Sequence, residues 1–214
     1  MIGAASKCFL VFVLACSSGS AQQTRTLLVN GTAAIINKKV VTIQDAFVFR
    51  AMQRVKSGQE PIILEEEGDN LKKTVQKIVF EEMVLAEMKS LQKGVNVQNE
   101  FSKWFKEGKE QKKGLQIIKQ RYGVGDADLA QIVTRTLTAD RFVQMKIETV
   151  TPVITEDEAQ KYFKRNEAQF RGRSYESLKP NIVVLLKKQA VQKSLEEWVR
   201  SLKEKYEVTM LLES

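Results

Sequence analysis

The C-terminal part of the chain carries its most regular hydrophobic pattern. Apolar residues recur mostly in steps of three or four, the spacing of one helix face, at Leu178, Ile182, Leu185, Val191, Leu195, Trp198 and Leu202. This pattern predicts a helix from Leu178 to about Lys205, with its N-cap near Ser177 and Pro180 in the first turn, where proline is tolerated. Tyr206–Leu212 follows as a predicted strand. Because such a helix is about 42 Å long, other helices must lie along it.

The N-terminal segment holds the other strand candidates. Thr26–Val29 and Thr32–Ile36 flank Asn30-Gly31, a pair of residues that favours a two-residue hairpin turn. A second turn at residues 37–39 leads to Val40-Val41. We therefore expect a small β element close to the start of the folded chain.

The first helix is predicted to begin directly after these strands. Thr42 and Asp45 have the spacing of a capping box, and Ser57-Gly58 marks the end of the helix. Because a final strand needs a partner, Tyr206–Leu212 is predicted to pair beside Thr32–Val41. That pairing brings the two ends of the chain together and is expected to bury Trp198 near the first helix.

The middle of the chain alternates helical patterns with capping and breaking residues. The predicted helices are 70–93 (stopped by Gly94), 96 to about 108, 110–122, 127–149 (stopped by Thr151-Pro152) and a short helix after the Thr155/Glu158 capping box. The sequence contains three prolines and no internal repeat. We therefore predict a mainly α fold: a multi-helix core, a small β element made from both ends, and a long C-terminal helix.

The first residues have the organisation of an export signal. Lys7 precedes an apolar run, Phe9–Ala15, and small residues follow to Ala21, so residues 1–21 are expected to be removed and 22–214 to form one domain. The run Val13–Cys16 also resembles a bacterial lipobox, which would make 1–15 a lipoprotein signal and leave a lipid on Cys16. Both routes, and a third in which Cys16 is an ordinary residue of the apolar run, remain open. Each export route predicts the bacterial periplasm, with attachment to a membrane only through Cys16.

The composition argues against catalysis. The chain has no histidine, and its two cysteines, Cys8 and Cys16, both lie in the predicted signal, so the commonest general base, thiol nucleophile and zinc ligands are missing. No glycine-rich phosphate loop is present, and Gly123-Val124-Gly125 lacks both a third glycine and a preceding strand. We expect no enzyme activity, no metal and no cofactor.

The formal net charge is +8, and basic residues alternate with acidic ones along the predicted helices. This alternation is typical of solvated helix faces; the alternative is a basic surface that attracts acidic unfolded clients or anionic lipid. Nucleic acid is not an expected partner, since export would separate the chain from it and no groove-reading motif occurs.

Methionine and aromatic residues are the candidates for a binding surface. Flexible thioethers and large rings suit surfaces that accept varied apolar segments. The peptide-binding candidates are Phe47, Met52, Met83, Met88, Trp104 and Phe105. At helical spacing the same residues fit a hydrophobic core, and the pattern leaves both alternatives open.

Several segments, in this order, resemble the SurA-type periplasmic chaperones, which are related to exported parvulin-type peptidyl-prolyl isomerases. The resembling segments are Ile35–Thr42, Tyr122–Leu129, Pro152–Glu158 with Tyr162-Phe163 and Phe170, Tyr175–Pro180, Leu195–Trp198 and Tyr206–Val208. One departure is informative. The isomerase members carry a parvulin domain of roughly a hundred residues where this chain has only Arg171–Ser174 between Phe170 and Tyr175.

The resemblance implies a chaperone core without its catalytic insert. We therefore expect an ATP-independent holdase that binds unfolded or nascent envelope proteins, including outer-membrane proteins, through apolar surface between helices. The alternative is a non-catalytic envelope adaptor or structural subunit that serves one dedicated partner.

Overall fold

The computed structural model describes residues 31–61, 68–106 and 109–212. In this part of the chain the elements are β1 (Thr32–Ile36), β2 (Lys39–Thr42), α1 (Ile43–Lys56), α2 (Gly68–Ser90), α3 (Gln98–Lys106), α4 (Lys109–Tyr122), α5 (Asp126–Val150), α6 (Glu156–Arg165), the short 3-10 helix η1 (Glu167–Phe170), α7 (Tyr175–Lys205) and β3 (Val208–Met210). The protein is mainly helical with a small antiparallel sheet, which confirms the predicted fold class.

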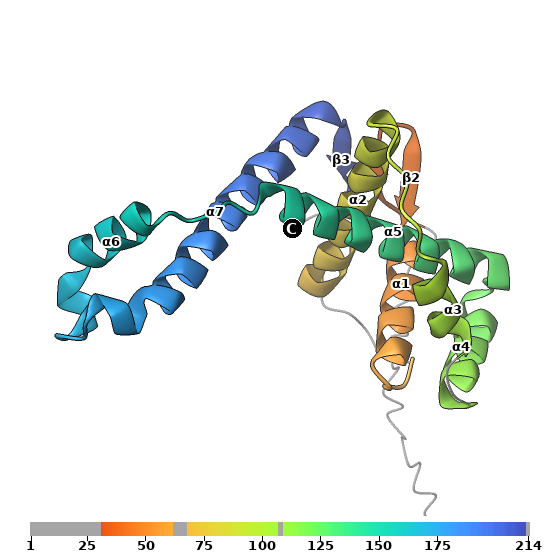
Figure 1. The fold of residues 1–214 in the computed structure, drawn as a ribbon. Coiled ribbons are helices and arrows are strands. Elements are labelled where there is room, and N and C mark those ends of the chain that lie inside the picture. Colours follow the sequence, from red (N-terminus) through yellow and green to blue (C-terminus); the bar gives the residue numbers. More distant parts are fainter. Residues whose placement is uncertain (1–30, 62–67, 107–108, 213–214) are drawn as a thin grey trace, which may run out of the picture.

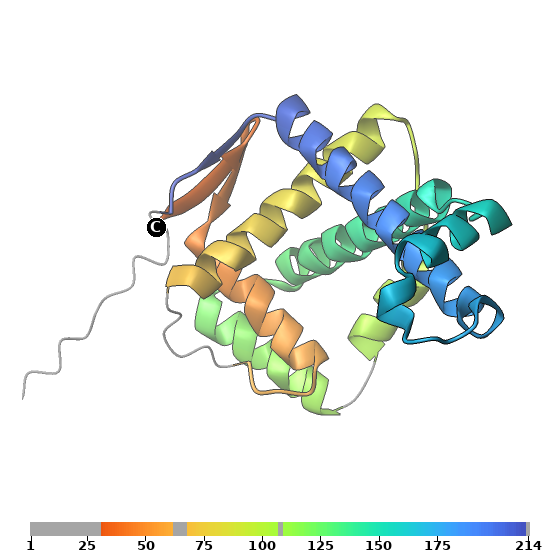
Figure 2. The ribbon, with the colours of Figure 1, turned by 90° about the vertical axis from the view of Figure 1, so that its left-hand side faces the viewer.

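The sheet joins the two ends of the described chain. Its strand order is β2-β1-β3, and both neighbours run antiparallel to β1. Ile36 lies opposite Lys39 of β2 and opposite Val208 of β3. The predicted pairing of a C-terminal strand with the N-terminal strands is therefore confirmed. Figure 2 shows the sheet on one side of the helices, beside the end of α7.

The hairpin predicted at Asn30-Gly31 falls largely outside the described residues, as does Thr26–Val29. Both sides of β1 are occupied over its length. Thr32 pairs with Thr42 of β2, and on the other side the N–H of Leu211 donates to the carbonyl of Ala33 at 2.9 Å. Within the described residues, the hairpin is the β1–β2 turn at residues 37–38.

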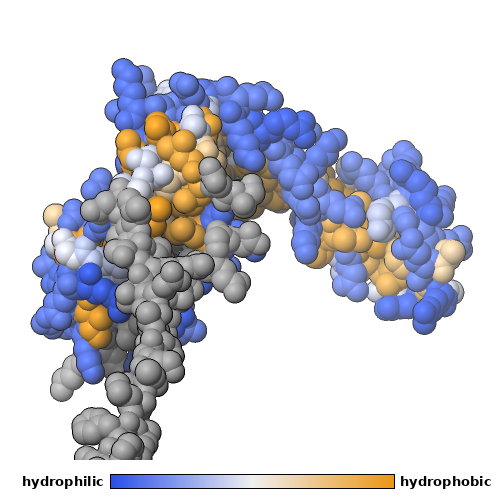
Figure 3. All heavy atoms as spheres, turned by 180° about the vertical axis from the view of Figure 1, so that it is seen from behind, coloured by the Kyte–Doolittle hydropathy of each residue, from blue (hydrophilic) through white to orange (hydrophobic). Residues whose placement is uncertain are grey.

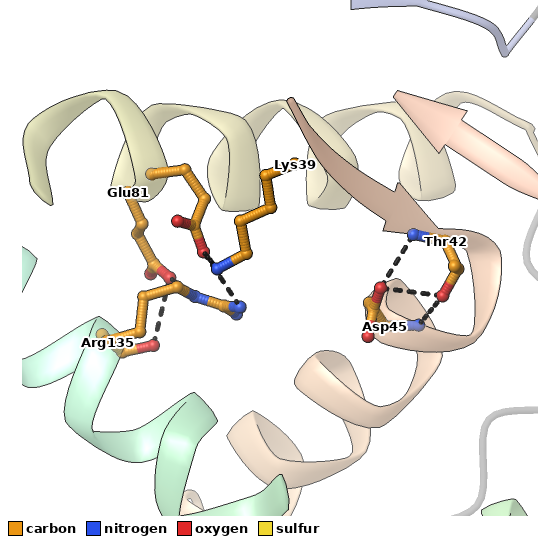
Figure 4. Close-up of polar contacts among 7 residues, drawn as sticks. Lys39, Thr42, Asp45, Glu81 and Arg135 are labelled. Atoms are coloured by element: carbon orange, nitrogen blue, oxygen red, sulfur yellow. Dashed lines mark hydrogen bonds and ion pairs between the residues drawn. The ribbon is translucent and has the colours of Figure 1, made fainter. Parts of the chain in front are cut away.

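The start of α1 is fixed by the predicted capping box. The Asp45 N–H donates to Thr42 Oγ1 at 3.0 Å, and the Thr42 N–H donates to Asp45 Oδ2 at 2.8 Å (Figure 4). Two of the otherwise unpaired N–H groups at this helix end are satisfied in this way. The second predicted box, at Thr155 and Glu158, also forms and begins α6.

Two predicted helix ends are wrong. α7 begins at Tyr175 with Ser174 as its N-cap, so Pro180 lies beyond the first turn. Contacts with α6 explain the longer helix: the Tyr175 hydroxyl donates to Glu156 at 2.8 Å, and Lys179 forms an ion pair with the same carboxylate. The second error is the end of α2. It ends at Ser90, and the turn that follows has Gln92 at φ 51° rather than continuing to Gly94.

The helices and the sheet enclose two adjoining hydrophobic clusters, which together form the body of the protein. The first lies between the sheet, α1, α2, α5 and the end of α7, and the second between α1, α3, α4 and α5. Helices α1 and α4 approach closely because Gly114 has no side chain: a Cβ there would lie 2.7 Å from Cγ2 of Val55.

A third hydrophobic cluster lies outside the body. It consists of Ala159, Leu178 and Ile182, with aromatic residues of α6 and η1 packed around them. Residues 156–186 therefore form an arm with its own small core, and Figure 1 shows this arm projecting from the body. No helix in the described residues is long and apolar enough to span a membrane.

Trp198 is buried, as predicted, but its ring partners come from α2 and α5 rather than from α1, near which it was expected. Its centroid lies 6.3 Å from that of Phe80 and 6.3 Å from that of Phe142. At the end of α7, Glu87 of α2 accepts hydrogen bonds from Lys205 at 2.6 Å and from the Tyr206 hydroxyl at 2.9 Å. The C-terminal helix is thus anchored by both apolar and polar contacts.

Deleting residues 206–214 should lower the melting temperature by at least about 5 °C. The deletion removes β3, the buried Tyr206 ring and its hydrogen bond to Glu87, and it leaves one edge of β1 unpaired. About 2–4 °C is expected per kcal/mol of lost stability in a chain of this size. Thermal unfolding followed by circular dichroism tests this, and an unchanged melting curve would show that β3 contributes nothing to the fold.

Candidate functional site: an apolar groove on the C-terminal helix

Helix α7 connects the arm to the body. Its first part supplies Leu178 and Ile182 to the core of the arm, and its last part supplies Trp198 and Leu202 to the core of the body. Residues 187–197, between these two anchors, form a bridge (Figure 1). The arm is carried by one continuous helix, α7, which is longer than the body is wide and so extends beyond it.

A groove of about 700 Å³ runs along this bridge and into the anchored part of α7. The residues that line the α7 groove are Lys187, Lys188, Val191, Gln192, Leu195, Glu196, Val199, Arg200 and Lys203. Its apolar residues are Val191, Leu195 and Val199, which stand four residues apart on one face and are half-buried. Figure 3 shows hydrophobic surface on the hollowed side between the body and the arm.

The rim of the α7 groove is basic. Lys187 and Lys188 lie at one end, Arg200 and Lys203 lie towards the other, and all four are exposed. Glu196 is the one carboxylate among the lining residues, and it accepts a hydrogen bond from Gln192 at 2.9 Å. Within the described residues, no carboxylate forms an ion pair with any of the four cations. The groove therefore combines an apolar floor with unneutralised positive charge.

The arm is held in shape by aromatic packing. Phe163 stacks on Phe170 with centroids 5.3 Å apart and meets Tyr175 edge-on at 5.6 Å. The hydrogen bond from Lys179, followed in size by that from Tyr175, lowers the pKa of Glu156. Burial and, after it, the contact with Glu156 raise the pKa of Tyr175 to about 12. Glu156 is thus ionised and Tyr175 neutral at neutral pH, which keeps the contact between α6 and α7 intact.

Exposed apolar side chains lie in the arm and in the segment directly before it. Val184 is 66% exposed on α7, and Val153 is 88% exposed in the segment that leads to α6. Neither residue lines the α7 groove. Single exposed valines are common on protein surfaces, so the groove rather than the arm tip is the better candidate site.

None of the six sequence-predicted site residues is among the residues that line the α7 groove. Four of them, Phe47, Met52, Met83 and Trp104, are at most 8% exposed. Met52, Trp104 and Phe105 belong to the second cluster, whereas Met83 and Met88 belong to the first. Phe105 and Met88 are half-buried. A role of these residues in client binding stays a prediction, but their packing makes them part of the core in this conformation.

Sequence reasoning missed the α7 groove because it assigned Val191 to the packing face of the helix, together with Leu195, which does pack against the first cluster. The useful signal was the charge pattern. Between Leu186 and Trp198 the sequence KKQAVQKSLEE contains three lysines, which indicates a stretch that no other element covers. A helix that is amphipathic over its whole length but too long for its partner must leave part of its apolar face open.

A group of charged side chains connects β2, α2 and α5 (Figure 4); Glu81, Glu82 and Arg135 are largely buried, whereas Lys39 is exposed. Arg135 donates through Nε to Glu81 Oε2 at 3.0 Å, and Lys39 Nζ lies 2.6 Å from Glu82 Oε1. Burial raises the pKa of Glu81 above its ordinary value, although the nearby Arg135 charge opposes this rise. A cavity of about 430 Å³ adjoins Lys39, Glu82 and Arg135. The charges neutralise one another, so this cluster is suited to holding α2 against α5.

Several residue classes that support chemistry do not come together in the described part of the chain. No group of three or more histidine, cysteine, aspartate or glutamate side chains there could hold a metal ion. Cys16, the predicted lipidation site, lies outside the described residues.

Comparisons with models of known protein families, with curated proteins and with solved structures find no match for this chain. The geometry of α7 and the chemistry of its side chains are therefore what points to a function.

Proposed function

We propose that this protein is an ATP-independent chaperone of the bacterial periplasm that holds unfolded envelope proteins, including outer-membrane proteins, in the α7 groove. The observation that carries this proposal is the half-buried apolar stripe of Val191, Leu195 and Val199, which runs from the bridge onto the body, where Leu195 and Val199 also pack against the first cluster. Apolar side chains left uncovered at such a place are available to another chain. The SurA-like order of sequence segments supports the same function and the same location.

The energetics fit transient holding. Covering the remaining apolar surface of these three half-buried side chains contributes about 1 kcal/mol for each. Ordering a disordered client offsets part of this gain. The three side chains together contribute about 3 kcal/mol, which corresponds to a dissociation constant of at least several millimolar, so clients would bind weakly and leave without nucleotide hydrolysis.

The test is suppression of aggregation. The protein should keep several unrelated unfolded clients soluble at near-equimolar amounts without ATP, and the cis/trans rate of a prolyl peptide should stay unchanged. Val191→Asp should weaken the suppression, because a carboxylate in the apolar floor disfavours burial of a client segment. Val184→Asp is the matched control, since it places the same charge on an exposed position of the same helix outside the groove.

The compact, charged rim favours a second candidate function, an adaptor for a single partner. Failure to protect several unrelated clients would contradict the chaperone and leave the adaptor. Equal loss in Val191→Asp and Val184→Asp would show that clients bind elsewhere. Circular dichroism of both variants confirms that each remains folded.

A further inference from the structure

We propose that the α7 groove selects apolar segments of about seven residues that are flanked by aspartate or glutamate. This inference rests on the proposed function, because it names the class of client segment that the same groove binds. Its basis is the position of the four rim cations, which lie towards the two ends of the apolar stripe rather than around it evenly.

The spacing along α7 matches an extended peptide. Val191, Leu195 and Val199 stand four residues apart, which is about 6 Å along a helix. Alternate side chains of an extended chain point to the same side and are separated by about 6.6 Å. Three apolar residues in alternating positions of a client can therefore meet the three apolar residues of the stripe.

The ends of that client segment fall near the cations. Lys187 lies about 6 Å before Val191 along the helix axis, and Lys203 lies about 6 Å beyond Val199. Lys188 and Arg200 lie within the same end turns. A segment of about seven residues with one flanking residue at each end spans about 26 Å, close to the distance of about 24 Å between Lys187 and Lys203. Its two flanking side chains point to the same side as the three apolar ones and reach the basic ends. Carboxylates at those two places would neutralise charge that has no partner in the described structure.

A second copy of this chain is a poor occupant of the groove, because both ends of its own groove are also positively charged. In an antiparallel pair of α7 helices, Lys187 and Lys188 of one copy meet Arg200 and Lys203 of the other. In a parallel pair each cation meets its own counterpart. Either arrangement brings like charges together around the apolar floor, which disfavours association.

The test uses three labelled peptides that share one alternating apolar core and end in aspartate, serine or lysine. Fluorescence anisotropy of the full protein should show the aspartate-ended peptide binding about tenfold more tightly than the serine-ended one, as expected for a few exposed ion pairs. The lysine-ended peptide should bind most weakly. The differences should shrink in about 0.5 M salt, because screening acts on exposed charges.

Charge reversal at the rim should invert this order. The variant carries Lys187→Glu, Lys188→Glu, Arg200→Glu and Lys203→Glu. The matched control carries Lys73→Glu, Lys93→Glu, Lys112→Glu and Lys164→Glu, which are exposed lysines outside the groove and give the same change in net charge. The control should keep the preference for aspartate ends. Inversion in both variants would mean that net charge, rather than the groove, determines selection.

The outcomes separate this inference from the proposed function. Suppression of aggregation without any difference between the three peptides would overturn the acidic preference and leave the chaperone. A preference for aspartate ends without suppression would support the groove and contradict the chaperone. Binding to vesicles that contain anionic phospholipid, with no peptide binding, would overturn the inference in favour of a membrane surface. Dimerisation lost on charge reversal would overturn it in favour of a second copy.

Discussion

Replacing Trp198 with alanine should lower the free energy of unfolding by about 3–5 kcal/mol, the range seen for large aromatic residues removed from a core. The indole is 8% exposed and lies between Phe80 of α2 and Phe142 of α5. Lys146 also stands 5.7 Å from the centre of the ring. Removing the indole of Trp198 leaves a cavity at the point where α7 meets the body, and the neighbouring rings can close that cavity only in part.

Urea denaturation followed by circular dichroism gives the measurement, since the remaining Trp104 would complicate a fluorescence signal. Val184→Ala on the same helix is the control, because Val184 is 66% exposed and should change stability by less than about 0.5 kcal/mol. A loss below about 1 kcal/mol in Trp198→Ala would mean that α7 is held mainly by Leu202, Tyr206 and β3. The groove would then depend on a different anchor.

Features set by nearby residues were predictable from the sequence. The capping boxes at Thr42/Asp45 and Thr155/Glu158 need only a side chain and a backbone group three residues apart, so the local sequence determines them. The pairing of β1 with β3 was predictable for a different reason. The C-terminal segment was a strand without a local partner, and the N-terminal strands offered an edge.

Features set by distant contacts were not predictable. The first turn of α7 exists because Tyr175 packs on Phe163 and reaches Glu156 of α6, and neither contact can be recognised from residues near Ser174. The pairing of Glu81 with Arg135 has the same character. Both residues occur in charge-rich helices, where a buried carboxylate and a solvated one have the same sequence pattern.

The candidate site was partly predictable, but its residues were not. A binding surface between helices was predicted, whereas the residues that line the α7 groove all belong to one helix, and client binding there stays a proposal. Met52 and Trp104 were selected because thioethers and rings suit variable partners, yet their helical spacing places them in the second cluster. Val191 was assigned to packing, yet it lies where α7 has left the body. Which part of an amphipathic face remains open depends on how far the partner helices extend.

Replacing Arg135 with methionine should destabilise the protein by about 3–5 kcal/mol near neutral pH. Glu81 is 2% exposed, and Arg135 supplies its hydrogen bond at 3.0 Å, with the Thr136 hydroxyl at 3.2 Å as a further donor. The guanidinium also stands 5.8 Å from the centre of the Phe49 ring. Methionine fills much of the same volume, so the main consequence is a buried carboxylate that has lost its countercharge.

The loss should be smaller at acidic pH. Burial already raises the pKa of Glu81 above its ordinary 4.5, and removing Arg135 raises that pKa further. The folded variant therefore binds more protons than the unfolded chain between 4.5 and the raised pKa, so its stability falls as pH rises through this range. Urea denaturation of both proteins at about pH 5 and about pH 7 should show a larger difference at pH 7.

A double variant distinguishes a lost charge pair from lost packing. Combining Arg135→Met with Glu81→Leu removes both charges, and replacement of a buried pair by apolar residues is often close to neutral. The double variant should therefore recover most of the stability lost in Arg135→Met, and its stability should no longer depend on the titration of Glu81. If the double variant instead loses the sum of what Arg135→Met and Glu81→Leu lose separately, with the same pH profile as Arg135→Met, the two side chains act independently. The ion pair would then have no part in holding α2 against α5.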